Sequence, residues 1–336
     1  MKALAQQARI AASTIDISVD GKQHGFLTLP CASARSAFGT VQIPVFVIRN
    51  GDGPIVTLLA GSRGDEFDGQ VALHRLIETI NIDDLSGCLI IAPTLNVQAT
   101  SNQSRYTPVD GKDLDECFPG DESGSVTEQM AALIFNTIVE PASLVIEFQS
   151  GGASARFTSL AAVHFNADNK ALQQTNEQHM IAFGAPYSAR LLPGHAASLA
   201  TAVQNTDKEF IGIRLGGGGS VDASCIDIAH IGIRNVLVQA GLLKQDLVLR
   251  ATRMLEVASP NNYVIAPCAG LLEMCRNTGD EVYMGSPLAK IIQPGNTSAD
   301  TIVINADRNG ILMSHHHAGM IEQGDCVAIV ADEVQR

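Results

Sequence analysis

Hydrophobic and polar residues follow strand-length and helix-length patterns along the first 258 residues. Short apolar runs bounded by glycine, proline or polar residues predict strands. They lie at Thr14–Val19, Gly25–Leu29, Val41–Arg49, Ile55–Leu59, Cys88–Ala92, Ser143–Glu147, Ser159–Phe165 and Asn235–Val238. Apolar residues every three or four positions predict helices at Gly69–Ile80, Val126–Val139 and Asn169–Phe183. Strands that alternate with helices are typical of an α/β fold, here a mixed sheet flanked by helices.

The pattern changes near Ala258. After it, short apolar runs alternate with Gly-Asp turns, and no helix-length pattern appears. A weak internal repeat is present, since Gly279–Val282 is echoed by Gly324–Val327. The sequence therefore predicts two domains: an α/β domain over residues 1–258 and a C-terminal all-β barrel-sandwich domain over residues 259–336.

Composition narrows the class of partner. The chain has 336 residues and a net charge of -13, with no basic stripe, which argues against nucleic acid and anionic membranes as partners. No apolar run is long enough to span a membrane, and the first residues lack the apolar core of a signal peptide. The seven cysteines contain no Cys-x-x-Cys pair and are odd in number, which favours free thiols in a reducing compartment. We expect a cytoplasmic protein.

Two strand ends carry the candidate chemistry. Gly61–Glu66 follows one apolar strand, and Glu147–Gly152 ends another. Side chains three residues apart at one strand end, joined by a third from another strand end, form the ligand set of a catalytic zinc. Position 63 is an arginine, however, and its guanidinium has no lone pair and repels a divalent cation.

These segments resemble motifs of the succinylglutamate desuccinylase/aspartoacylase family, zinc amidohydrolases on a carboxypeptidase-like α/β fold. The resemblance covers nearly the whole chain and implies a zinc-carboxypeptidase-like fold. In the motif Gly-x-His-Gly-x-Glu, Arg63 replaces the histidine and Glu66 is retained. In Asp-Leu-His-x-Gly-Gly, Gln149 takes the place of the histidine. The resemblance thus gives Arg63, Glu66 and Gln149 as vestigial metal positions, and we expect no zinc or other cofactor there.

A third segment, Arg105–Gly120, resembles the family's Arg-x-x-Pro-x-Asp-Gly-x-Asp-Leu-Asn-Arg-x-Phe-Pro-Gly. The resemblance implies that Arg105 binds the substrate and polarises the scissile carbonyl. Asp115 and Glu116 replace the Asn-Arg pair that grips a substrate carboxylate in the family. This reversal of charge is expected to repel such a carboxylate.

The fourth segment, Gly232–Gly241, resembles Gly-Ile-Pro-x-x-Thr-x-Glu-x-Gly, whose glutamate activates the zinc-bound water. Gln239 stands in place of that glutamate. An amide cannot act as the proton acceptor, so general-base catalysis is not expected from this position.

Three hypotheses follow. The first is a noncatalytic family member, a pseudoenzyme that binds a small molecule in its vestigial cleft or has a regulatory role, with Arg63 in the space of zinc and paired with Glu66 or Glu116. The alternative is a zinc-dependent amide or ester hydrolase, an N-deacylase, with a rearranged metal site built from Glu66, Asp115, Glu116 or the histidines at 315–317. The third is a structural subunit that pairs with an active paralogue, and homo-oligomerisation also remains open. For the three histidines themselves we expect a solvated hairpin tip.

Overall fold

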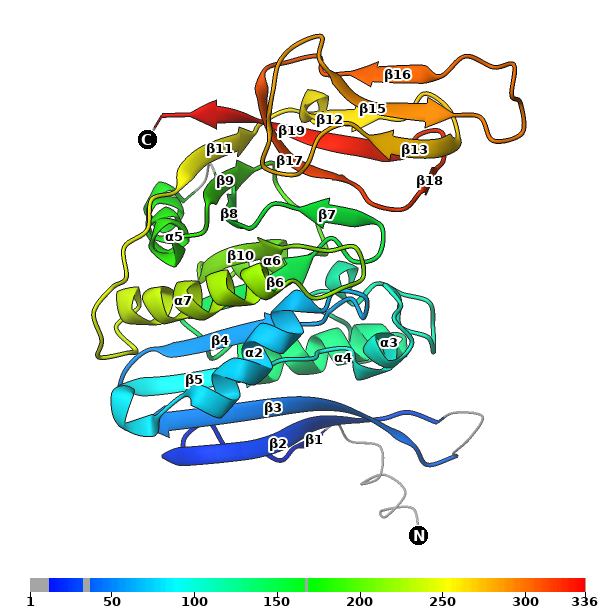
Figure 1. Cartoon of the computed structure of the whole chain (residues 1–336). Helices are drawn as coiled ribbons and strands as arrows, with labels where there is room; N and C mark the ends of the chain where they lie inside the picture. The colour runs from blue at the N-terminus through cyan, green and yellow to red at the C-terminus, as the bar shows by residue number, and fades with distance from the viewer. Residues whose placement is uncertain (1–11, 33–36, 167–168, 336) are drawn as a thin grey trace.

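One long twisted sheet runs through the protein from the N-terminal hairpin to the C-terminal strands (Figure 1). The computed structural model describes residues 12–32, 37–166 and 169–335. The order of strands in this 15-stranded sheet is β1-β2-β3-β5-β4-β6-β10-β8-β9-β11-β19-β17-β14, with β7 and β12 paired to its side. The strands of the first part are β1 (Ala12–Ser13), β2 (Gly21–Pro30), β3 (Thr40–Asn50), β4 (Ile55–Ala60), β5 (Gly87–Ala92), β6 (Leu144–Ser150), β7 (Ala155–Phe157), β8 (Leu160–His164), β9 (Tyr187–Leu191), β10 (Glu209–Leu215) and β11 (Arg253–Val257).

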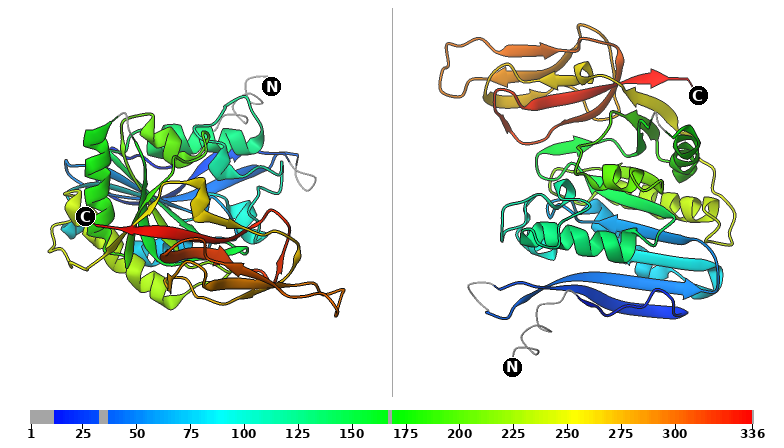
Figure 2. Two further views of the ribbon diagram at one scale, coloured as in Figure 1. Left: turned by 90° about the horizontal axis from the view of Figure 1, so that it is seen from above. Right: turned by 180° about the vertical axis from the view of Figure 1, so that it is seen from behind.

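Helices cover both faces of this sheet (Figure 2). Residues of α2, α5 and α7 share one apolar core with the sheet, and residues of α4 and α6 share the other. The helices are α2 (Asp68–Thr79), α3 (Val97–Ser101), α4 (Val126–Ile134), α5 (Lys170–Phe183), α6 (Leu199–Gln204) and α7 (Ala223–Gln239), with short turns η1 (Ile82–Asp84), η2 (Leu114–Glu116), η3 (Phe135–Val139) and η4 (Pro260–Asn262).

Strand β6 shows how the sheet positions polar side chains. Successive residues of a strand face opposite sides of the sheet. Ile146 and Phe148 belong to the core with α2, α5 and α7, and Val145 belongs to the core with α4 and α6. Glu147 and Gln149 alternate in step with Val145, so their side chains point to the α4 and α6 side.

The C-terminal strands form a second antiparallel sheet beside the long one. Its order is β16-β15-β13-β18, and it packs on a core of its own that includes Leu288, Ile291, Leu312 and Val327. The strands of this part are β12 (Tyr263–Ile265), β13 (Gly270–Met274), β14 (Glu281–Val282), β15 (Pro287–Ile292), β16 (Ile302–Asn305), β17 (Gly310–His316), β18 (Met320–Ile321) and β19 (Cys326–Val334). The expected fold class, a mixed α/β sheet with helices and a C-terminal β region, is confirmed.

The division of the chain after Ala258 stays a prediction. It falls between β11 and η4, but β11 pairs with both β9 and β19, so the long sheet continues across that point.

Two predicted strands are wrong. Asn235–Val238 lies inside α7, whose buried residues recur at helical spacing, from Cys225 and Ile226 through Ala229 to Ile233. The four-residue apolar run is too short to distinguish a strand from the end of a buried helix. Thr14–Val19 is not a strand either, because the Asp16 carboxylate accepts hydrogen bonds from the backbone N–H and hydroxyl of Ser18 and turns the chain.

Gly64 lets the loop after β4 approach α3. A Cβ atom at Gly64 would lie 2.0 Å from the carbonyl carbon of Ala99. We predict that Gly64→Ala lowers the free energy of unfolding by about 1–3 kcal/mol, because backbone must shift to admit the methyl group. Gly295→Ala is the matched control, since nothing lies within 4 Å of its added Cβ. Chemical denaturation of both variants measures the difference, and equal stabilities would contradict the prediction.

Candidate active site

Two adjoining pockets lie where the parallel strands β4, β6 and β10 end. The inner pocket has a volume of about 210 Å³ and the outer pocket about 460 Å³. Arg63, Gln149 and Arg214 line both of them. The inner pocket also contains Asp115, Glu147 and His164, and the outer pocket contains Asp65, Glu66 and Arg105. We call the two together the cleft.

Arg63 is held by three carboxylates. Its Nε lies 2.8 Å from Asp113 Oδ2, its Nη2 lies 3.0 Å from Asp115 Oδ2, and its Nη1 lies 3.6 Å from Glu66 Oε1. Burial by itself lowers the pKa of Arg63, but the carboxylates of Asp115, Glu66 and Asp113 outweigh it and hold the pKa above its ordinary value. Arg63 therefore stays charged. It pairs with Glu66 as expected, but its shortest contacts are to Asp113 and Asp115 and not to Glu116.

Arg105 lies at the outer rim of this cluster. Its Nε is 3.0 Å from Asp113 Oδ2, and its Nη2 is 3.9 Å from Glu116 Oε1. The side chain of Arg105 is 43% exposed and that of Glu116 is 48% exposed. The structure thus brings Arg63, Glu66, Arg105, Asp115 and Glu116 together, and their roles stay predictions.

Two carboxyl groups in the cleft are unusually easy to protonate. Burial raises the pKa of Glu66 to about 7, although Arg63 and the backbone N–H of Ser150, which donates to Glu66 Oε2 at 2.9 Å, oppose the shift. Burial raises the pKa of Glu147 to about 8, and the neighbouring Asp115 adds to the effect. The cleft can therefore exchange protons near neutral pH.

The residues at the family's metal position do not fit a zinc ion. Glu66 is paired with Arg63, and Gln149 Nε2 donates to Asp115 Oδ2 at 3.2 Å. The permanently charged guanidinium of Arg63 lies among these groups, where it repels a cation. Across the described ranges, no group of three or more His, Cys, Asp or Glu side chains could hold a metal ion.

Gln239 is not part of the cleft, which corrects its assignment to the general-base position. It is the last residue of α7. The chain just after it bonds at the amino end of β5, where Ser86 N–H donates to Leu242 O at 2.9 Å. The cleft lies at the carboxyl ends of the parallel strands, on the opposite edge of the sheet.

Arg214 is the cleft residue that sequence reasoning missed. It is the penultimate residue of β10 and lies directly opposite Gln149 of β6. Its Nη1 is buried and has no hydrogen-bond partner among the described residues. The signal for it was present, because Arg214-Leu215-Gly216 has the Glu-x-Gly spacing of the family's base segment and directly follows the apolar residues Phe210–Ile213.

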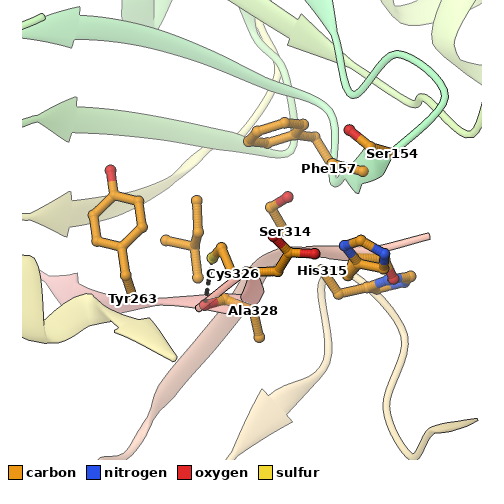
Figure 3. Close-up of a pocket in the computed structure, with 11 residues that line it drawn as sticks. Ser154, Phe157, Tyr263, Ser314, His315, Cys326 and Ala328 are labelled. Carbon is orange, nitrogen blue, oxygen red and sulfur yellow. Dashed lines mark hydrogen bonds between the residues drawn. The ribbon is translucent and has the colours of Figure 1, made fainter. Parts of the chain in front are cut away.

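The C-terminal β region contributes to a third pocket, which shares Ser154, Ala155 and Phe157 with the outer pocket. Strand β7 pairs with β17. The third pocket has a volume of about 330 Å³, and residues of β7, β12, β17 and β19 line it, among them Phe157, Tyr263, His315 and Cys326 (Figure 3). His315 Nδ1 lies 2.7 Å from His316 O, and His316 Nε2 lies 2.9 Å from Met320 O. These two histidines belong to β17, so the expected hairpin tip is wrong for them, whereas His317 is exposed in the turn that follows β17.

Comparison with known proteins settles the family. The sequence profile of the succinylglutamate desuccinylase/aspartoacylase catalytic domain matches residues 52–240. The chain belongs to this family. A curated relative, N-alpha-acetyl-L-2,4-diaminobutyric acid deacetylase of Halomonas elongata, is 34% identical over 326 residues, which are 96% of this chain and 95% of the relative.

Solved structures of similar proteins have the same fold over nearly the whole chain. The product-bound ectoine utilization protein EutE (DoeB) of Ruegeria pomeroyi superposes with a TM-score of 0.93 at 39% identity, over 96% of this chain and 99% of that one. A succinylglutamate desuccinylase of Silicibacter sp. TM1040 gives a TM-score of 0.92 at 36% identity, over 96% of this chain and 98% of that one.

These relatives correct the leading hypothesis. Family members of 34% and 36% identity over nearly the whole chain are named as a deacetylase and a desuccinylase. The expectation of a noncatalytic pseudoenzyme with a degenerate site is therefore wrong, and the hydrolase alternative agrees better with the family.

No helix in the described part of the chain is long and apolar enough to cross a membrane.

Glu147 gives a prediction for stability against pH. Its folded-state pKa of about 8 lies above the ordinary value of 4.5. The stability that it contributes is therefore fully present below about pH 4.5 and is lost as the pH rises through about 8. We predict that Glu147→Gln, which stays neutral, makes the fall of the melting temperature between about pH 5 and about pH 9 shallower. Glu116→Gln, the same change at a half-exposed carboxylate, is the control, and identical slopes for Glu147→Gln and the unaltered protein would refute the prediction.

The ion pairs of Arg63 give a prediction for metal binding. We predict that calorimetric titration with zinc shows no stoichiometric site in the cleft, because a fixed cation occupies it. Arg63→His together with Gln149→His should create a zinc site with Glu66, and Arg63→His alone should bind far more weakly because it supplies one ligand fewer. Stoichiometric zinc in the unaltered protein that disappears in Glu66→Ala would overturn this prediction.

Proposed function

We propose that the protein is an amide hydrolase that removes the acyl group from a small N-acyl compound carrying a positive charge. The observation that carries the proposal is Arg214 in the cleft, a partly buried residue whose Nη1 atom is buried and has no partner among the described residues. A buried donor without a partner is costly in an empty site and is satisfied when a ligand oxygen accepts from it. The likeness to the named deacetylase supports the same reaction class.

The arginines of the cleft suit the carbonyl group of an amide. Arg214 Nη1 can donate to the carbonyl oxygen, and Arg105 lies across the outer pocket. When water adds to the carbonyl carbon, negative charge develops on this oxygen, and fixed positive groups stabilise that charge more than they stabilise the neutral amide. Arg63 adds a third positive charge whose position is fixed by its ion pairs.

The acidic groups suit a cationic substrate. Asp113 and Asp115 are engaged by Arg63. Glu116 remains half exposed at the inner pocket, with Arg105 no closer than 3.9 Å, so its carboxylate can accept from an ammonium group of the substrate. The diaminobutyric acid in the name of the Halomonas elongata relative carries a second amino group, which is protonated at neutral pH. We infer an N-acetylated diamino acid or a related amine as the substrate class.

The residues present do not fit zinc, so the proposed steps use side chains only. Water supplies the oxygen that bonds to the acyl carbon, the carbon–nitrogen bond breaks, and the products are a carboxylic acid and an amine.

The seven cysteines are free thiols, a state that the reducing cytoplasm maintains, and we place the reaction there.

A substrate panel tests the proposal. N-α-acetyl-2,4-diaminobutyrate, N-acetylaspartate and N-succinylglutamate are incubated with the protein, and release of the free amine is measured. We expect kcat/KM for the cationic compound to exceed that for the acidic compounds by at least about tenfold, the equivalent of one favourable charge contact. Glu116→Gln should lower the ratio of kcat/KM for the cationic compound to kcat/KM for the acidic compounds.

The variant Arg214→Met tests the proposed function a second way. Loss of a donor to the developing oxyanion is expected to lower kcat by about 10²- to 10³-fold. Arg234→Met is the matched control, because Arg234 lies on α7 and lines neither pocket of the cleft, although its Nε is also buried without a partner among the described residues. Absence of hydrolysis for every member of the panel, or an unchanged kcat in Arg214→Met, would count against the proposal.

A further inference from the structure

His164 lies over the inner pocket on the same face of the sheet as Glu147. Glu147 of β6, Gly212 of β10 and Ala162 of β8 are neighbours across three strands. His164 is two residues beyond Ala162 on β8, and residues two apart in a strand share a face. Ala162, His164 and Gly212 all line the inner pocket.

The backbone fixes which nitrogen of His164 carries the proton. Its Nδ1 lies 2.6 Å from the carbonyl oxygen of Leu192. A carbonyl oxygen only accepts hydrogen bonds, so Nδ1 donates and the lone pair of the neutral ring is on Nε2. No described residue forms a hydrogen bond with Nε2. The hydrogen bond of Nδ1 to Leu192 O therefore fixes the orientation of the ring. The basic nitrogen, Nε2, is available to a ligand or to water.

Burial favours the neutral form of the ring. Burial lowers the pKa of His164 below 6.5, and Arg214 lowers it further, while the bond to Leu192 and the carboxylate of Asp115 oppose the shift. The other titratable groups that line the same pocket are Arg63, Glu116, Glu147 and His195.

Gly212 leaves room between His164 and Arg214. A Cβ atom at Gly212 would meet nothing closer than Phe210 Cε1 at 3.8 Å and Ala162 O at 4.0 Å. An added methyl group would make only ordinary van der Waals contacts here, and the space that glycine leaves is part of the inner pocket.

The carboxyl groups of the cleft are poorer candidates for a base. Glu66 is committed to Arg63 and to the backbone N–H of Ser150. Glu147 is protonated at neutral pH because burial raises its pKa to about 8.

We propose that His164 is the general base of the hydrolysis proposed above. Nε2 takes a proton from water as the water oxygen bonds to the amide carbonyl carbon, and the carbonyl electron pair moves onto the oxygen facing Arg214. That pair then returns, the carbon–nitrogen bond breaks, and Nε2 gives its proton to the leaving nitrogen. The products are a carboxylic acid and an amine, and the ring ends as it began. This inference rests on the proposed function.

His164→Asn tests the role, because the Asn side chain can keep the donor to Leu192 O but offers no base. With the hydrolysed substrate of the panel, we expect kcat to fall by about 10²- to 10⁴-fold while KM changes by less than about threefold. The unaltered protein should lose kcat/KM as the pH falls through a midpoint below about 6.5, because only the neutral ring accepts a proton. His230→Asn, an exposed histidine of α7, is the control.

The outcomes separate the two proposals. If the unaltered protein hydrolyses the panel and His164→Asn keeps its kcat within threefold, the role of His164 is overturned and the proposed function stands. If the unaltered protein hydrolyses nothing, both are overturned. Nitrogen-15 NMR of the unaltered protein provides a test that needs no variant: the neutral Nδ1–H tautomer of His164 at pH 7 supports the role, and a doubly protonated ring at pH 7 overturns it.

Discussion

The ion pairs of Arg63 with Asp113, Asp115 and Glu66 join the loop after β4 to the segment around η2, and the cleft is built around them. A buried carboxylate that loses its partner costs about 3–5 kcal/mol. The guanidinium therefore stabilises acidic side chains that would otherwise repel one another in a region of low dielectric constant. The positive charge of Arg63 also repels a divalent cation. The same place in the cleft can therefore hold either the family's metal ion or the ion pairs of Arg63, but not both.

The sequence predicted the part of the cleft that depends on strand ends. Apolar runs that end in Gly61–Glu66 and Glu147–Gly152 belong to neighbouring parallel strands, and parallel strands bring their carboxyl ends to one edge. Asp113 was not predicted as the main partner of Arg63. Several carboxylates follow one another in that segment, and only the folded path of the loop decides which of them reaches the guanidinium.

The error at Gln239 has a different cause. The segment Asn235–Val238 contains branched apolar residues that also suit the buried face of a helix, and the helical spacing begins ten residues earlier, at Cys225. The motif resemblance over Gly232–Gly241 placed the general-base position at Gln239, at the wrong edge of the sheet, and concealed Arg214. No sequence motif marks His164. Its proposed role depends on the hydrogen bond of its ring to Leu192 O, and only the fold brings that carbonyl group to the ring.

The absence of zinc ligands suggests a loss of catalysis, but the named activities of the relatives contradict that inference. Absent ligands argue against one mechanism only. The decisive measurement is amine release from N-α-acetyl-2,4-diaminobutyrate by protein prepared in chelator, with bound metal quantified in the same sample. Our account predicts an unchanged rate at a metal content far below one equivalent per chain. A rate that rises in proportion to bound zinc would contradict it.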